Sequence, residues 1–146
     1  MSDHGQTPSE PARPATAIAL PATGWAAVLR GLSGRCPRCG EARLFARWLK
    51  PAGHCPHCRQ DWSHQRADDF PAYISIFLTG HIMAPVIIAL VRDTHLSMPV
   101  LATIILILAS ILMMGLLQPA KGAVIAMQWW FGLHGFVRER ADGKTP

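Results

Sequence analysis

Two stretches decide the fold of this chain, Cys36-Pro37-Arg38-Cys39 and Cys55-Pro56-His57-Cys58, because they hold all four of its cysteines. Each is a Cys-x2-Cys pair, and fifteen residues separate the first pair from the second. Two such pairs at this spacing are typical of a zinc site with four thiolate ligands. We therefore predict a zinc-ribbon module over residues 35–66 that binds one structural Zn²⁺. The predicted ligands are Cys36, Cys39, Cys55 and Cys58.

Other uses of the four cysteines stay open at this point. An iron–sulfur centre, a redox Cys-x2-Cys pair and transient metal transfer use the same residues. A redox pair normally lies on a thioredoxin-like frame, of which the sequence has no sign. His54 and His57 lie beside the second pair. Either imidazole could replace a thiolate, although exposed surface histidines are the more ordinary interpretation.

The predicted module is too small to be held together by apolar burial alone. Bound zinc would supply the missing stability, on the order of 10 kcal/mol in comparable peptides. Between the two pairs, Leu44, Phe45, Trp48 and Leu49 are expected to cover one side of a very small core.

Two long apolar segments follow the module. Residues 70–91 contain no Asp, Glu, Lys or Arg, and residues 98–117 are interrupted only by Thr103 and Ser110. As a helix, each segment reaches roughly 30 Å, which is the thickness of a bilayer's hydrocarbon core. We therefore expect an α-helical membrane protein in which these segments form a two-helix transmembrane hairpin.

The charge distribution predicts the orientation of that hairpin. Of the 14 Lys and Arg, nine precede the first apolar segment, one lies between the segments and four follow the second. Segments rich in Lys and Arg stay on the cytoplasmic side of a membrane, so both termini are expected in the cytoplasm. Thiols remain reduced in that compartment, which argues against disulfides.

Three shorter segments complete the organisation. Residues 1–22 are rich in Pro, Ala, Ser and Thr and predict a disordered tail, and residues 137–146 form a basic tail. Residues 23–34 predict a short amphipathic helix capped by Thr23. Its apolar stripe either lies on an anionic membrane surface or packs on the metal module, and the sequence favours neither.

Residues 119–136 are apolar and aromatic and predict a separate interfacial or re-entrant helix. Trp129 and Trp130 are expected in the headgroup region, where amphipathic rings are common. Lys121 would contact lipid phosphates at the end of the preceding helix. His134 should lie near the cytoplasmic surface.

The first apolar segment carries three further candidate contacts for a partner or ligand. Asp68 and Asp69 precede it. Asp69 fits a helix cap, and both carboxylates could meet a docking partner or relay a metal. His81 lies midway along the segment, where an ionisable side chain is a candidate functional site. It could ligate haem or copper, or donate to a carbonyl that Pro85 leaves free.

Several of these motifs occur together and in order. They are Gly34-Arg35-Cys36-Pro37-Arg38-Cys39-Gly40, Ala67-Asp68-Asp69-Phe70-Pro71, Gly80-His81-Ile82, Pro119-Ala120-Lys121-Gly122 and His134-Gly135. With them the chain resembles the bacterial membrane family catalogued as domain of unknown function 983, over residues 25–136. One position differs, because Arg59 stands where that family commonly has glycine.

The resemblance implies a two-helix protein of the bacterial inner membrane. Some members of that family are encoded near genes for cytochrome oxidase subunits and assembly factors, which implies a role in the biogenesis of a respiratory complex. The resemblance implies no particular activity or substrate.

We carry three functional hypotheses forward. The first is a membrane-anchored zinc adaptor that binds a partner membrane protein, and the second is a metal or haem handler for oxidase biogenesis. The third is a nucleic-acid-binding zinc ribbon, since residues 30–66 hold eight basic and two acidic residues. Its stacking candidates Phe45, Trp48 and Trp62 are needed for the core, which makes nucleic acid an unlikely partner. No catalytic constellation is evident, and the sequence indicates no oligomeric state.

Overall fold

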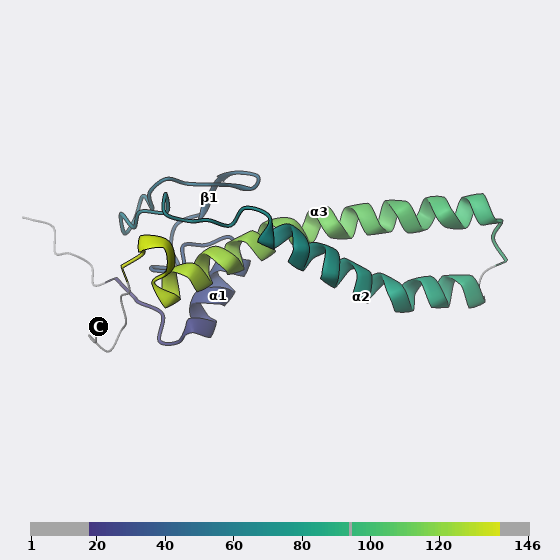
Figure 1. Cartoon of the computed structure of the whole chain (residues 1–146), viewed down its shortest axis with the longest axis horizontal. Coiled ribbons are helices and arrows are strands. Elements are labelled where there is room, and N and C mark those ends of the chain that lie inside the picture. Colours follow the sequence, from purple (N-terminus) through teal and green to yellow (C-terminus); the bar gives the residue numbers. More distant parts are fainter. Residues whose placement is uncertain (1–17, 94, 138–146) are drawn as a thin grey trace, which may run out of the picture.

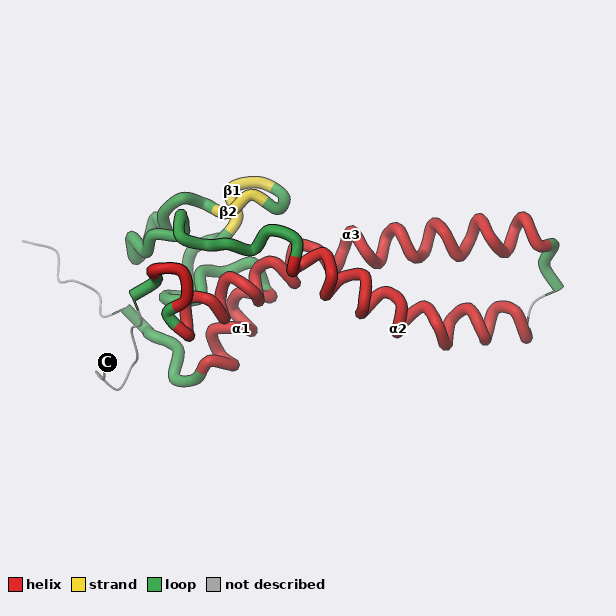
Figure 2. Tube along the Cα trace, in the orientation of Figure 1, coloured by secondary structure: helices red, strands yellow, loops and turns green. Residues whose placement is uncertain are grey.

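The computed structural model describes residues 18–93 and 95–137 (Figure 1). Most of the predicted N-terminal tail and almost all of the predicted basic tail lie outside these residues. The elements in chain order are α1 (Gly24–Leu32), β1 (Phe45–Arg47), β2 (Lys50–Pro51), α2 (Phe70–Asp93), α3 (Met98–Phe131) and the short 3₁₀ helix η1 (Leu133–Gly135). Loops form most of the chain between α1 and α2 (Figure 2).

The helices α2 and α3 lie side by side and run in opposite directions along the long axis of the molecule (Figure 1). Both are long and apolar enough to cross a membrane, by length and composition. Large apolar side chains along both helices are exposed, among them Phe77, Ile88, Leu106 and Ile111. An apolar surface of this kind is suited to lipid and costly in water.

The predicted separate helix over residues 119–136 is wrong, because α3 continues without a break from Met98 to Phe131. Pro119 lies inside this helix, and Figure 1 shows α3 changing direction along its length. Proline removes one backbone hydrogen bond and usually ends or kinks a helix. Here the part after Pro119 is retained because its apolar face is buried, with Ile125 and Trp129 fully inaccessible.

Burial also overturns the predicted place of Trp129. Trp129 lies inside the protein core and has no surface for contact with lipid headgroups, whereas Trp130 is partly buried against that core. The ring of Trp129 meets that of Trp62 edge to face, with 6.3 Å between the ring centroids. Such pairs add to the stability that burial of the two indoles supplies.

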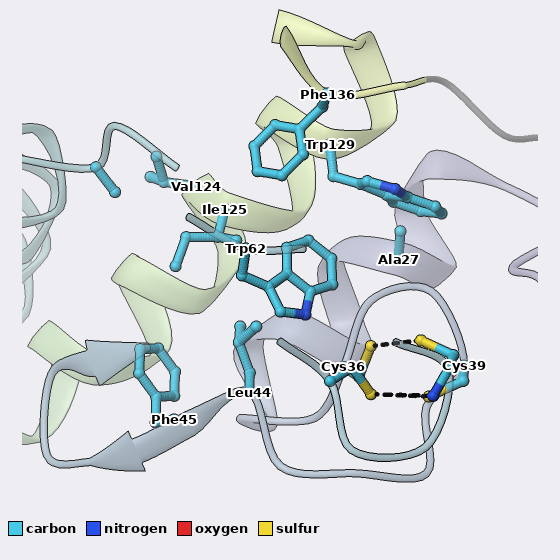
Figure 3. Close-up of a cluster of buried hydrophobic side chains, with 13 residues drawn as sticks. Ala27, Cys36, Cys39, Leu44, Phe45, Trp62, Val124, Ile125, Trp129 and Phe136 are labelled. Carbon is cyan, nitrogen blue, oxygen red and sulfur yellow. Dashed lines mark hydrogen bonds between the residues drawn. The ribbon is translucent and has the colours of Figure 1, made fainter. Parts of the chain in front are cut away.

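The core joins the loop region to the C-terminal part of α3 (Figure 3). Leu44, Phe45 and Trp62 come from the loops and the hairpin, and pack with residues of α3 and with Phe136 beyond it. Of the apolar residues predicted between the two cysteine pairs, Leu44 and Phe45 are buried. Trp48 is not, because the turn between β1 and β2 leaves it 56% exposed.

Helix α1 falls within the predicted helix over residues 23–34, and the side chain of Thr23 caps it by accepting from the Ala26 N–H at 3.1 Å. Its buried residues are the small ones, Ala27 and Gly31. The larger apolar residues of the predicted stripe, Trp25, Leu29 and Leu32, are 67%, 46% and 37% exposed. The helix therefore packs on α3 through a face of small residues and leaves most of its apolar stripe exposed.

Two glycines allow this packing. A Cβ added to Gly31 would overlap the carbonyl oxygen of Gly122, and one added to Gly122 would overlap the carbonyl oxygen of Gly31. The backbones of α1 and α3 therefore touch at this crossing, as small residues permit.

The end of the predicted tail also differs from expectation. Pro21 is fully buried, and Ile18 packs against the core. The carbonyl of Ala19 accepts a hydrogen bond from Arg30 at 3.0 Å. Apolar contact and this charged hydrogen bond order residues 18–22, which composition alone assigned to the tail.

Candidate metal centre

The four cysteines come together in one buried cluster. Their sulfur atoms all lie within 4.8 Å of one another, and their side chains belong to the core. The distance from Cys36 Sγ to Cys58 Sγ is 3.7 Å, and that from Cys39 Sγ to Cys55 Sγ is also 3.7 Å. All four are free thiols, with no disulfide between them.

These distances fit a tetrahedral metal ion. With metal–sulfur bonds of about 2.3 Å, the sulfur atoms of a regular tetrahedron are about 3.8 Å apart. A disulfide would need about 2.05 Å between two sulfurs. Figure 3 shows the sulfurs facing one another between the two loops that carry them. The residues present therefore fit a metal bound by four thiolates.

The two loops hold their cysteines with the same backbone pattern. The N–H of Gly40 donates to the carbonyl of Cys36 at 2.8 Å, and the N–H of Arg59 donates to the carbonyl of Cys55 at 2.9 Å. Both donors have a positive φ, 75° for Gly40 and 58° for Arg59. Arg59 thus takes the conformation that glycine takes in the first loop, at the energetic cost that a side chain brings there.

Two arginines hold the loops in place, and no sequence pattern predicts either role. The guanidinium of Arg30 on α1 donates to the carbonyl of Arg38 at 3.1 Å and to that of Pro37 at 3.4 Å. The guanidinium of Arg38 in turn donates to the carbonyl of Cys58 at 2.9 Å. A hydrogen-bonded chain therefore runs from α1 through the first loop to the second.

Without a cation the pKa values of Cys36, Cys39 and Cys58 are shifted in different directions. Burial raises the pKa of Cys36, and the neighbouring cysteines raise it further. Burial also raises the pKa of Cys58. At Cys39 burial acts in the same direction, but the backbone N–H groups of Ala42 and Glu41 outweigh it and lower the pKa to about 6. A bound cation would replace the repulsion between thiolates by attraction to the metal.

The neighbouring histidines are not part of the cluster. Neither His54 nor His57 contributes a ring nitrogen to the group of potential ligands. His54 Nε2 lies 3.8 Å from the Asp61 carboxylate, and His64 Nε2 lies 3.7 Å from it. Hydrogen bonds from Ser63, helped by these two imidazoles, lower the pKa of Asp61. The histidines thus belong to the exposed surface beside the second loop.

Asp68, Asp69 and His81 lie away from the sulfur cluster, and among the described residues they form no further metal-ligand group. Both carboxylates are exposed. The carbonyl of Asp69 accepts from the N–H groups of Ala72 and Tyr73, at 2.9 and 3.2 Å, so its backbone lies at the start of α2.

His81 interacts with its own helix. Its Nδ1 lies 2.8 Å from the carbonyl oxygen of Phe77, and its ring lies 4.0 Å from the Phe77 ring between centroids. This bond fixes a proton on Nδ1, because a carbonyl only accepts. Pro85 has no N–H, so the carbonyl that it leaves free is that of His81, four residues earlier. The His81 ring is bonded to the carbonyl of Phe77 instead, so it does not fill the predicted role.

Lys121 differs from its predicted surroundings, whereas nothing contradicts the prediction for His134. Lys121 lies within α3 and is partly buried, since the helix does not end before it. His134 lies in η1, with a φ of 58°, and is exposed. The structure brings neither residue to the sulfur cluster.

Gln128 has a structural role that sequence reasoning missed. Its Nε2 donates to the carbonyl of Arg66 at 2.6 Å, and its Oε1 accepts from the N–H of Arg66 at 3.0 Å. The side chain is buried. The sequence signal that could have predicted this role is the polar side chain of Gln128 on the apolar face of a helix, next to Trp129. The two bonds tie the segment before α2 to α3.

A family model described as "Protein of unknown function (DUF983)" matches residues 45–129 of the chain. The chain belongs to the DUF983 family. The matched part of this DUF983 protein includes α2, all but the last two residues of α3, and the second cysteine pair, Cys55 and Cys58. The first pair precedes it, so the metal site is inferred from the geometry of the four thiols. No curated protein and no solved structure matches the chain.

Proposed function

We propose that this DUF983 protein is a membrane-anchored zinc adaptor that presents a rigid, metal-bound module to a partner membrane protein. The observation that carries the proposal is the continuity of α3, whose C-terminal part supplies Ile125 and Trp129 to the core around the sulfur cluster. A module that shares its core with a membrane-crossing helix is held at a fixed place on the bilayer.

Zinc is the metal that we propose. Four thiolates in a tetrahedron suit Zn²⁺ or an iron centre, and zinc needs neither a redox partner nor an assembly machinery. The thiols are only 0–8% exposed, which favours a permanent structural ion over one that is exchanged. A metal handler needs ligands that a recipient can reach, so the buried cluster counts against that alternative.

The orientation that we propose places the module and both termini in the cytoplasm of a bacterial cell. Support comes from the nine Lys and Arg that precede α2, against one between the two long helices. In this arrangement α2 and α3 form a transmembrane hairpin whose connection, around Leu96, lies on the outer side of the inner membrane.

The partner is proposed to meet Asp68 and Asp69, just before α2, and His81, midway along α2, all of which are exposed. The exposed stripe of α1 offers a second, apolar contact area. The resemblance described above makes an assembling respiratory complex the partner to test first. Binding to nucleic acid is less well supported, because Trp62 and Phe45 are buried and cannot stack on bases.

Metal analysis of the full chain, purified in detergent, tests the zinc adaptor against the metal or haem handler. We expect one zinc per chain and no absorbance band characteristic of haem. Bound haem, or copper in place of zinc, would contradict the adaptor.

Cysteine labelling of intact cells with a membrane-impermeant maleimide tests the orientation. We expect Ser97→Cys, in the connection between α2 and α3, to react at once. The matched variant Ala46→Cys, exposed on β1, should react only after permeabilisation. The reverse pattern would place the module outside and contradict the proposal.

Photocrosslinking tests the partner. A crosslinking residue at position 68 or 81 should capture one discrete membrane protein, and an assembling respiratory subunit is expected. A crosslinker at position 111, exposed on α3, is the control. Equal yields at all three positions would indicate random collision and contradict a docking site.

A further inference from the structure

A basic cavity of about 580 Å³ lies between the metal module and Gln118 of α3. Three arginines line it, Arg35, Arg43 and Arg47, together with one acidic residue, Glu41. Among the described residues, none of the three guanidiniums forms an ion pair with a carboxylate. The cavity therefore holds an excess of positive charge, and its ordinary ligand would be an anion.

The cavity continues into a smaller groove on α3 whose lining is partly polar and partly apolar. Both are lined by Ser33, Gly34, Trp48 and Gln118, and the groove adds Leu32, Met114, Gly115 and Pro119. Trp48 lies in the turn between β1 and β2. Figure 2 shows this hairpin pointing towards the start of α2. Trp48 and Met114 are 56% and 51% exposed. The site is thus basic at one end, and the side chains that only the groove contributes at the other end are apolar.

Its apolar end falls at the predicted edge of the bilayer. Met114 and Gly115 belong to the last turn of the apolar segment, and Gln118 follows directly after it. Arg43 and Arg47 lie on the side of the metal module. A tryptophan at this boundary is characteristic of contact with lipid headgroups.

We propose that this site binds the headgroup of an anionic glycerophospholipid from the cytoplasmic leaflet, with its acyl chains along α3 below Met114. The inference rests on the proposed membrane insertion of α2 and α3. The guanidiniums would hold the phosphate with charge-assisted hydrogen bonds, and Trp48 would cover the glycerol region. A bound lipid would fill the gap between the hairpin and α3 and fix the module on the membrane surface.

A phospholipid fits better than a soluble anion, because it has a charged part for the arginines of the cavity and an apolar part for Met114 and Leu32 of the groove. Inorganic phosphate would use the arginines and leave the groove open. A nucleic acid would need a row of exposed stacking residues, and of the aromatic residues between the cysteine pairs only Trp48 is exposed.

Native mass spectrometry of the full chain, released from detergent, tests the proposal. Phosphatidylglycerol and phosphatidylcholine with the same acyl chains would be titrated separately. We expect tighter binding of phosphatidylglycerol, and a loss of about fivefold in its affinity for each of Arg43→Gln and Arg47→Gln. Arg59→Gln is the matched control, since it removes an equal exposed charge at the second cysteine loop. It should leave the preference unchanged.

Each other outcome overturns the lipid site. Equal binding of both lipids, or equal losses for Arg47→Gln and Arg59→Gln, would mean that the cavity does not select a headgroup. If inorganic phosphate or a short RNA, at the same concentration as the lipid, displaced phosphatidylglycerol, the arginines would be a binding site for a soluble anion. Zinc content shows that each variant is folded. Resistance to carbonate extraction tests membrane insertion separately, so a failed proposed function and a failed lipid site give different results.

Discussion

The side-chain amide of Gln128 pairs with the backbone of Arg66 through both of its polar ends, in the manner of a strand pairing with its neighbour. The contact joins residues 62 positions apart. It lies where the metal module passes into α2, so it fixes the path by which the chain enters the predicted membrane segment.

Gln128→Glu should destabilise the protein by about 2–3 kcal/mol, because a carboxylate cannot donate to the Arg66 carbonyl and would be buried beside it. Gln65→Glu makes the same change nearby and keeps the oxygen that accepts from the Ala67 N–H, so it should change stability little. Chemical unfolding of the protein in detergent, followed by tryptophan fluorescence, measures both. Equal midpoints for the two variants would show that the Gln128 bonds contribute nothing.

Gly31→Ala and Gly122→Ala should each lower the free energy of unfolding by about 2–3 kcal/mol, because the new methyl group would overlap backbone of the facing helix. The overlap is with a carbonyl group, which cannot move aside as a flexible side chain can. Gly80→Ala is the control, since a Cβ there meets nothing within 4 Å. The unfolding midpoint of the Gly80 variant should stay level or rise. A normal midpoint for Gly122→Ala would contradict the close crossing.

Cys36→Ser should remove the metal and unfold the module, since one of four ligands is lost and metal binding supplies on the order of 10 kcal/mol. His54→Ala and His57→Ala should retain one metal per chain, because neither imidazole belongs to the cluster. Metal analysis and limited trypsin digestion read out both effects. A Cys36→Ser protein that resists trypsin without metal would show that the ion is not structural.

Arg59→Gly should stabilise the metal-bound protein by about 1 kcal/mol, because glycine takes a φ of 58° without the strain of a side chain. Gly40→Ala should do the opposite, since it brings a Cβ to a φ of 75° and within 3.1 Å of the Arg30 guanidinium. Thermal unfolding monitored by zinc release compares the two with wild type. A lower midpoint for Arg59→Gly would mean that the Arg59 side chain makes a contact worth more than the strain.

The sequence was most informative where a local pattern has a single physical meaning. The spacing of Cys36, Cys39, Cys55 and Cys58 predicted their convergence, because four thiols so close in sequence have few other stable arrangements. The uninterrupted apolar runs predicted two long helices, because apolar segments of this length are typical of helices that can cross a membrane. The cap at Thr23 was also found where the pattern placed it.

Tertiary packing decided what local pattern could not. Pro119 predicted a helix end, but the burial of Trp129 outweighs one lost hydrogen bond and keeps α3 intact. Gly31 and Gly122 carry no periodic signal, although they set the closest approach between two helices. No local pattern predicted a role for Arg30, and only the fold brings it to the carbonyls of the first cysteine loop.

Because α3 runs from Met98 to Phe131 without a break, about 50 Å of one helix connects the exposed apolar segment to the core around the four cysteines. If the apolar segment is inserted in a membrane as proposed, a partner that tilts α2 and α3 within the lipid would also move the module. Mechanical coupling between the two regions would then follow from the continuity of one backbone segment.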